Sequence, residues 1–346
     1  VGSEMCIRDS VLLVHITRGM ILVTGGSGFI GSNLNAALAA DGQEVAIADW
    51  LGQEGQKWRN LYHNPPSHVV APEALEAWLA SNPHLSAIVH MGAISETTAR
   101  DADLVWRSNV TLSQMLWNWC ARHGVRFIYA SSAATYGDGA QGFEDDNDLA
   151  AMARLRPLNL YGWSKLAFDL WALRQVAAHR PAPPAWAGVK FFNVYGPNEY
   201  HKGKMISVVK VKHDEIIAGG PARLFKSDRP ELADGAQSRD FIHVDDVVAG
   251  LKFLLTTPAL AGIYNLGTGE ARTYADLARA VCAANGVEER IEYVEMPQAL
   301  RGQYQSFTQA PMHRMRALGF NHQFISLEAG VSAYIQNHLL KADPYK

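Results

Sequence analysis

The segment Met20-Ile-Leu-Val-Thr-Gly-Gly-Ser-Gly-Phe-Ile-Gly31 decides the fold of this chain. Its apolar start, its glycine-rich turn and the helical stretch at 32–39 predict a strand, a turn and a helix in that order. Gly25 and Gly28 permit a tight turn and a close approach of the backbone to a pyrophosphate, and Gly31 lets the helix pack on the strand. A helix N-terminus at this place favours an anion. The spacing is G-x-x-G-x-x-G, and its flanking elements favour a dinucleotide site over a plain surface loop.

Acidic and basic residues follow the next predicted strand, at 44–48. Asp49 comes eighteen residues after Gly31, where an acidic side chain meets the adenosine ribose of a dinucleotide. Asp49 alone favours NAD, because its carboxylate accepts a hydrogen bond from an unphosphorylated ribose. Lys57 lies eight residues further on and is placed to meet a 2′-phosphate. The segment therefore leaves NAD and NADP both open.

A second group of residues indicates acid–base chemistry. The predicted strand at 126–130 delivers the hydroxyls of Ser131, Ser132 and Thr135 to its carboxyl end, where catalytic groups gather in open parallel sheets. Tyr161 and Lys165 are four residues apart, so a helix places them on one face. A lysine near a tyrosine favours the phenolate. Small hydroxyls after a strand are often turn formers, but together these residues predict a Ser-Tyr-Lys site.

The rest of the chain suggests a parallel sheet followed by a smaller portion. Strands are predicted at 87–93, which ends in a turn beneath the cofactor, and at 188–197. From residue 198 the segments become irregular, and the polar loop at 199–205 has a solvated surface as its simplest reading. We therefore expect an α/β fold: a Rossmann-like doubly wound parallel sheet with a smaller C-terminal substrate-binding α/β domain. The expected division is a leader at 1–19, a dinucleotide-binding domain at 20–197 with 238–262 returning to it, and a substrate-binding domain at 198–237 and 263–346.

Composition excludes several classes of function. The formal net charge of −3 argues against a nucleic-acid partner held by a basic surface. No apolar run approaches the length of a membrane span, which argues against a membrane protein. The three cysteines are scattered, so they suggest neither a metal site nor a disulfide framework, and they fit a reducing, cytoplasmic compartment.

The motifs together resemble the extended short-chain dehydrogenase/reductase superfamily. The resemblance rests on T-G-G-x-G-F-I-G, S-S-A-A-T-Y-G, Y-G-W-S-K, F-F-N-V-Y-G-P and R-D-F-I-H-V-D-D, and it extends from Met20 to about residue 335. Three further stretches are similar to the ADP-L-glycero-D-manno-heptose 6-epimerase family. They are Tyr195-Gly-Pro-Asn-Glu-Tyr-His-Lys-Gly-Lys-Met205, Arg223-Leu-Phe-Lys226 and Arg301-Gly-Gln-Tyr-Gln-Ser-Phe-Thr-Gln309.

This resemblance implies an NADP-dependent isomerase, with NAD as the alternative cofactor. It would epimerise ADP-D-glycero-D-manno-heptose at C6 for the lipopolysaccharide core, by transient oxidation and re-reduction, as a homo-oligomer. Tyr161 and Lys202 would be the two acid/base groups, Ser132 would bind the reacting oxygen, and Lys165 would bind the nicotinamide ribose and lower the tyrosine pKa. The implied cofactor contacts are Gly25, Gly28, Phe29, Ile30, Gly31, Asp49, Trp50, Lys57, Met91, Gly92, Ala93, Asn109, Lys165, Val194 and Lys202. The implied substrate contacts are Ser132, Asn193, Lys204, Phe225, Arg239 and Tyr304.

Two alternatives stay open. Another nucleotide-sugar epimerase, such as a UDP-hexose 4-epimerase, shares most of these motifs. A catalytically silent dinucleotide-binding sensor shares the glycine-rich turn, but it has no need of the proton relay that Ser132, Tyr161 and Lys165 suggest. Dehydratases of the superfamily usually carry an Asp-Glu pair at the strand end, and Ser132-Ala-Ala-Thr135 lacks it.

Overall fold

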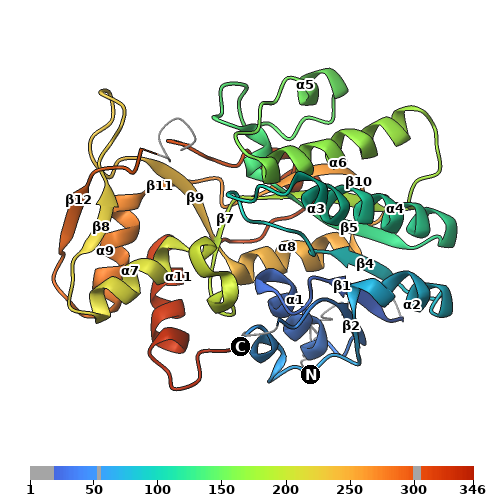
Figure 1. Ribbon diagram of the computed structural model, residues 1–346, viewed down its shortest axis with the longest axis horizontal. Coiled ribbons are helices and arrows are strands. Elements are labelled where there is room, and N and C mark those ends of the chain that lie inside the picture. The colour runs from blue at the N-terminus through green and yellow to red at the C-terminus, as the bar shows by residue number, and fades with distance from the viewer. Residues whose placement is uncertain (1–18, 53–55, 299–304) are drawn as a thin grey trace, which may run out of the picture.

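A seven-stranded sheet forms the centre of the computed structural model, which describes residues 19–52, 56–298 and 305–346. Its strand order is β10-β6-β5-β4-β1-β2-β3, and all neighbouring strands run parallel (Figure 1). The expected doubly wound α/β fold is therefore confirmed. The strands are β1 (Ile21–Thr24), β2 (Val45–Ala48), β3 (His68–Val70), β4 (Ala87–His90), β5 (Arg126–Ser132), β6 (Trp186–Phe191) and β10 (Ala261–Leu266).

Helices cover both faces of this sheet. Figure 1 shows α3 (Ala102–Trp106), α4 (Leu112–His123) and α6 (Leu160–Ala177) on one side, and α1 (Phe29–Ala40) and α8 (Val244–Thr256) on the other. The short α2 (Leu75–Ser81) precedes β4. Most strands of the sheet are buried along their whole length, as expected when helices cover both faces, and this burial explains their continuous apolar sequences.

A smaller lobe lies beside the sheet (Figure 1). It contains a three-stranded sheet in the order β11-β9-β7 and a two-stranded sheet of β12 and β8, and it has a hydrophobic core of its own. Its strands are β7 (Asn193–Tyr195), β8 (Ala222–Phe225), β9 (Ser238–His243), β11 (Ala271–Thr273) and β12 (Ile291–Val294). Its main helices are α7 (Val208–Ile217), α9 (Tyr274–Ala284) and α11 (Leu327–Tyr334).

The chain crosses between the two portions more often than the sequence suggested. The strand expected at 188–197 is divided at Phe192, whose N–H bonds Leu266 while Val194 bonds back to Phe192, so β6 stays in the large sheet and β7 joins the small one. The expected boundary at 263 falls inside β10, a strand of the large sheet. The segment 238–262 contributes β9 to the three-stranded sheet, while α8 packs against α1. The division into two functional domains remains a prediction.

Two further expectations concern the start of the chain and membranes. Of the leader expected at 1–19, residues 1–18 lie outside the described residues. Among the described helices, none combines the length and the apolar character needed to cross a lipid bilayer.

Trp117 provides a test of the main core. Its indole is fully buried, and it packs against Trp186 and Phe127 with ring centroids 5.0 and 6.2 Å away. Because the cavity left by truncation can collapse only in part, Trp117→Ala should lower the free energy of unfolding by about 3–5 kcal/mol. Trp163→Ala, at a tryptophan that is 46% exposed, is the matched control and should cost far less. Denaturant unfolding followed by circular dichroism would measure both, and equal losses would contradict this account of the core.

Candidate active site

A cleft of about 710 Å³ opens at the carboxyl ends of the parallel strands. β1 has β2 on one side and β4 on the other, so the chain leaves β1 and β4 in opposite directions, and ligands bind at such a point in open α/β sheets. The structure brings most of the predicted residues to this cleft. Those that line it are Gly25, Gly28, Phe29, Ile30, Gly31, Asp49, Lys57, Met91, Gly92, Ala93, Ser132, Tyr161, Lys165, Asn193, Val194 and Lys202.

The backbone of the glycine-rich turn packs so closely on its neighbours that two of its glycines leave no room for a side chain. Gly25 has φ +65°, and a Cβ there would lie 2.6 Å from the backbone nitrogen of Gly92. A Cβ on Gly31 would lie 2.2 Å from the carbonyl oxygen of Gly25. Helix α1 begins after Gly28 with no side chain capping it and no acidic residue in its first turn. The N-terminus of α1 therefore suits a bound anion, and the residues present fit a dinucleotide.

The residues at the end of β2 form a second polar cluster. One oxygen of Asp49 accepts hydrogen bonds from the backbone N–H and the hydroxyl of Ser27, at 3.1 and 2.6 Å. The other accepts from the ammonium of Lys57 at 2.7 Å and from the N–H of Trp50 at 2.9 Å. Asp49 thus joins the glycine-rich turn to Lys57, and an acid and a base both lie where the adenosine ribose is expected.

Ser132 and Tyr161 meet where β5 ends and α6 begins. Ser132 caps the short helix η4 (Ala133–Tyr136), because its hydroxyl accepts from the N–H of Ala134 at 3.1 Å. The side chain of Asn159 caps α6 by accepting from Gly162, which fixes the first turn of the helix. Burial raises the pKa of Tyr161, a hydrogen bond with Ser132 lowers it and the charge of Asp169 raises it. Tyr161 is therefore held as a protonated phenol beside Ser132.

Lys165 lies deeper on the same face of α6. It is almost fully buried, and its ammonium nitrogen is 6.0 Å from the centroid of the Tyr161 ring. Burial lowers the pKa of Lys165 to about 8, and the charge of Asp169 opposes that change. Burial dominates at Tyr161, so the net change of its pKa is upward, and the lowering of that pKa by Lys165 remains a prediction.

Lys202 reaches the cleft from the smaller lobe. It belongs to the short helix η5 (Tyr200–Met205), and its ammonium lies 5.0 Å from the centroid of the Phe29 ring at the start of α1. Burial lowers the pKa of Lys202, and the negative charge of Glu199 opposes this change. A solvated loop was the simplest reading of this lysine, but the structure places it in the cleft with Tyr161 and Lys165.

Three buried asparagines hold the Lys202 segment against the glycine-rich turn. The amide of Asn60, in η1 (Lys57–Leu61), donates to the carbonyl oxygens of Ser27 and Asn198 at 2.9 and 3.0 Å. Asn33 donates to Pro197, and Asn198 donates to Ser32. These bonds join the turn, η1 and the segment that leads into η5. Sequence reasoning missed all three residues, because an asparagine in a helix or in a turn carries no sign of a distant partner.

Other cleft residues were also missed. His201 lies beside Lys202 and 3.2 Å from the amide nitrogen of Asn60, and burial lowers its pKa to about 4. Only its position next to Lys202 could have drawn attention to it. Most of the remaining missed residues come from apolar stretches that read as core. They include Thr97, Met205, Ile206, Val208, Val209, Phe241, Leu277 and Gln305.

Asn109 supports the cleft without lining it. Its side chain bonds both the N–H and the carbonyl oxygen of Ile94 and also donates to the hydroxyl of Ser164, at 2.8, 3.0 and 2.9 Å. Asn109 therefore fixes the loop after β4 against α6. It acts on the cleft through these neighbours.

Four other predicted residues do not line the cleft, and one lies outside the described residues. Trp50 is 54% exposed, and its indole N–H bonds Glu73 at 2.8 Å. Arg239 is buried with its guanidinium over the ring of Tyr274. Lys204 is exposed, and Phe225 ends β8 opposite Val294 of β12. Tyr304 lies outside the described residues. The contacts expected of these residues with a ligand remain predictions.

Comparisons with known proteins identify the family of this chain. The NAD dependent epimerase/dehydratase family matches residues 21–267. An ADP-L-glycero-D-manno-heptose-6-epimerase of Nitratidesulfovibrio vulgaris (strain DP4) is 46% identical over 330 residues, which is 94% of this chain and 100% of that protein. The chain belongs to the ADP-L-glycero-D-manno-heptose-6-epimerase family. The resemblance inferred from the motifs is thus confirmed.

Further relatives agree with this family. Another ADP-L-glycero-D-manno-heptose-6-epimerase, of Fusobacterium nucleatum, is 42% identical over 336 residues, covering 94% of this chain and 100% of its own length. The crystal structure of the ADP-L-glycero-D-manno-heptose-6-epimerase of Helicobacter pylori superposes with a TM-score of 0.74 at 25% identity, covering 93% of this chain and 96% of that one. The large sheet and the smaller lobe are therefore both similar to a solved member of the family.

The asparagine contacts generate a prediction about cofactor affinity. Asn60→Asp keeps the shape of the side chain but replaces its N–H donors with an acceptor that faces two carbonyl oxygens. Losing such buried bonds costs about 1–3 kcal/mol, so dinucleotide binding should weaken by about tenfold or more. Asn82→Asp removes a similar amide, which bonds Trp78 far from the cleft, and is the matched control. Calorimetric titration would measure both affinities, and an Asn60→Asp protein that binds as tightly as the control would contradict this role.

Proposed function

We propose that this chain is an isomerase that interconverts ADP-D-glycero-D-manno-heptose and ADP-L-glycero-D-manno-heptose by inverting C6, a step toward the lipopolysaccharide core. One observation carries the proposal: Tyr161 and Lys202, from different lobes, line a single cleft beside a turn suited to a dinucleotide. The family relationship supports the same activity. The cytoplasmic location and the homo-oligomer implied by the sequence resemblance remain predictions.

The chemistry explains why the site has two basic groups. The hydrogen on C6 of the heptose is not acidic, so inversion there requires removal and return of a hydride, and a bound nicotinamide dinucleotide supplies that acceptance and return. The C6 hydroxyl occupies different positions in the two epimers. A proton-transfer group within hydrogen-bond reach of each position therefore serves both directions.

The electrostatics of the cleft assign the two roles. Burial raises the pKa of Tyr161, which favours its proton-donating form. Burial lowers the pKa of Lys202, which favours the neutral amine that can accept a proton. Burial thus favours the neutral form of each group, a phenol that can donate a proton and an amine that can accept one. Ser132, which already bonds Tyr161, is placed to hold the reacting oxygen.

We infer that NADP is the preferred cofactor. The support is the ammonium of Lys57, 2.7 Å from Asp49, which offsets the carboxylate at the place where a 2′-phosphate would lie. The hydroxyl of Ser27 lies in the same cluster, 2.6 Å from Asp49. A phosphate gains from a cation and from hydroxyl donors, whereas an isolated carboxylate would repel it.

Removing either proton-transfer group tests the two-base site. Tyr161→Phe and Lys202→Met should each lower epimerisation by about 10²–10⁴-fold while leaving the fold intact. Lys341→Met, at an exposed lysine that does not line the cleft, is the matched control and should retain most of the turnover. Chromatographic separation of the two ADP-heptose epimers, with no cofactor added, would measure the rates. A Lys202→Met protein that turns over at the wild-type rate would reduce the site to a single base and remove the 6-epimerase assignment.

Substitution of Lys57 tests the cofactor assignment. Lys57→Ala removes a charge-assisted contact with the 2′-phosphate, so NADP affinity should fall by about tenfold or more, while NAD affinity changes little. Titration of cofactor-free protein with each dinucleotide provides the measurement. The assignment is wrong if the unchanged protein binds NAD much more tightly than NADP.

A further inference from the structure

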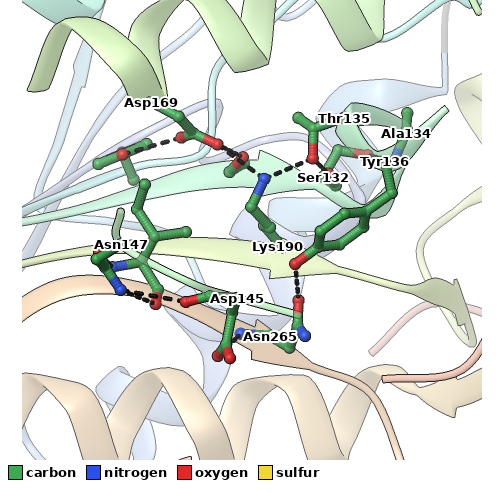
Figure 2. A network of polar contacts seen from close by, with 12 residues as sticks. Ser132, Ala134, Thr135, Tyr136, Asp145, Asn147, Asp169, Lys190 and Asn265 are labelled. Carbon is green, nitrogen blue, oxygen red and sulfur yellow. Dashed lines mark hydrogen bonds and ion pairs between the residues drawn. The ribbon is translucent and has the colours of Figure 1, made fainter. Parts of the chain in front are cut away.

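A fully buried ion pair lies beneath the candidate active site. Asp169, on α6, and Lys190, on β6, are each 0% exposed, and the lysine nitrogen is 3.0 Å from a carboxylate oxygen. Figure 2 shows the pair between helix and strand, with Thr135 and Ser132 beside it. Neither residue belongs to the set that the sequence or its resemblance assigned to the site.

Both members of the pair make further contacts with buried protein groups. Asp169 accepts hydrogen bonds from the hydroxyls of Tyr129 and Ser131, at 3.0 and 2.7 Å. Lys190 donates to the hydroxyl of Thr135 at 2.5 Å, and its nitrogen lies 4.7 Å from the centroid of the Tyr136 ring. A buried ion pair is seldom a net source of stability, because desolvation offsets its attraction. Its position beneath the cleft therefore suggests a role other than stability.

Hydrogen bonds connect the pair to the chain on both sides of Ser132. On one side, Ser131 bonds Asp169. On the other, Thr135 donates to the carbonyl oxygen of Ser132 at 2.8 Å and accepts from Lys190. Tyr161, Lys165 and Asp169 are spaced by four residues along α6, so they share one face of that helix. One ion pair thus joins the strand end that carries Ser132 to the helix that carries Tyr161.

We propose that Asp169 and Lys190 are positioning residues for the proposed epimerase reaction, which set the geometry of Ser132 and Tyr161 and balance the charge beneath them. The inference rests on the proposed function, because it concerns the same proton transfer. Neither side chain lines the cleft, so neither is expected to contact the substrate.

The charges of the pair also affect the pKa values of side chains in the cleft. The negative charge of Asp169 raises the pKa of both Tyr161 and Lys165, after the larger effect of burial on each. Lys190 places an opposite charge 3.0 Å from Asp169 and so limits that influence. Other titratable groups that interact with the pair lie on β5, on η4 and in the segment after η4. They are Tyr129, Tyr136 and Asp145.

Removing one charge at a time separates positioning from plain structural support. Asp169→Asn leaves the lysine cation unpaired, which favours the phenolate and should move the alkaline limb of the pH–rate profile, where the Tyr161 phenol loses its proton, to lower pH. Lys190→Met leaves the carboxylate unpaired and should move that limb to higher pH. At about 10–12 Å and an effective dielectric constant of about 20, each shift should be about one pH unit. Both single variants should also lose about tenfold or more in turnover, because Ser132 is displaced.

Two matched proteins complete the experiment. The double variant Asp169→Asn/Lys190→Met has no unpaired charge, so its limb should return to the wild-type pH while its turnover stays low. Tyr136→Phe removes a neutral hydrogen bond to Asn265 in the same region and should leave the limb in place. Ultraviolet titration of tyrosinate, as the difference between each protein and the same protein carrying Tyr161→Phe, reads the Tyr161 pKa without turnover.

The outcomes are distinct. Opposite shifts in the two single variants support the proposal, whereas equal shifts, no shift, or wild-type turnover in the double variant overturn it. If a single variant fails to fold, Thr135→Val provides the test. It removes the hydroxyl that connects Lys190 to the carbonyl oxygen of Ser132, and it leaves both charges of the pair in place. It should lower turnover with unchanged cofactor affinity, and unchanged turnover overturns the proposal. A wild-type protein that does not epimerise ADP-heptose would instead refute the proposed function, while the tyrosinate titration would still report on the pair.

Discussion

The hydrogen bonds from buried asparagine side chains to the backbone of the glycine-rich turn are the constraint on which the rest of this site depends. The side-chain amide of Asn60 donates to the carbonyl oxygens of both Ser27 and Asn198. It thereby joins the glycine-rich turn to the segment that continues into η5. The N-terminus of a helix and a tight glycine turn make an anion site by themselves, but they provide no second base. Because Lys202 comes from the smaller lobe, its place beside Phe29 requires that the two lobes be tied together at this point. The asparagine amides form the hydrogen bonds that connect the lobes in a buried region, where a donor without an acceptor would cost free energy of folding.

Burial acts in opposite directions on the two proton-transfer groups. It disfavours the charged form of each, so the phenol of Tyr161 becomes a weaker acid and the ammonium of Lys202 a stronger one. In these neutral forms, one group can donate a proton and the other can accept one. The same low-dielectric surroundings make the Asp169–Lys190 pair influential, since each charge there is felt over a longer distance than in water.

Local sequence patterns predicted the large sheet and much of the cleft. The glycine-rich turn, the strand-end hydroxyls and the Tyr161–Lys165 spacing are determined within a few residues, so periodicity and turn chemistry were enough. Lys202 was identified by resemblance alone, because nothing in its own loop distinguishes it from a solvated lysine. Asn60, Asp169 and Lys190 were missed, since their partners are distant in sequence and only the fold brings them together. The division of the expected strand into β6 and β7 at Phe192 was missed for a related reason: the backbone bond to Leu266 comes from a later strand.

We propose that C6 is inverted by hydride removal and return within one cleft. The most direct test uses ADP-D-glycero-D-manno-heptose with deuterium at C6, converted to near equilibrium in ordinary water and analysed by mass spectrometry. The account predicts that the product keeps its deuterium, because the hydride stays in the cleft throughout and only the hydroxyl proton passes through Tyr161 and Lys202. Loss of the deuterium to solvent at the rate of epimerisation would show that C6 is deprotonated instead, and would contradict the account.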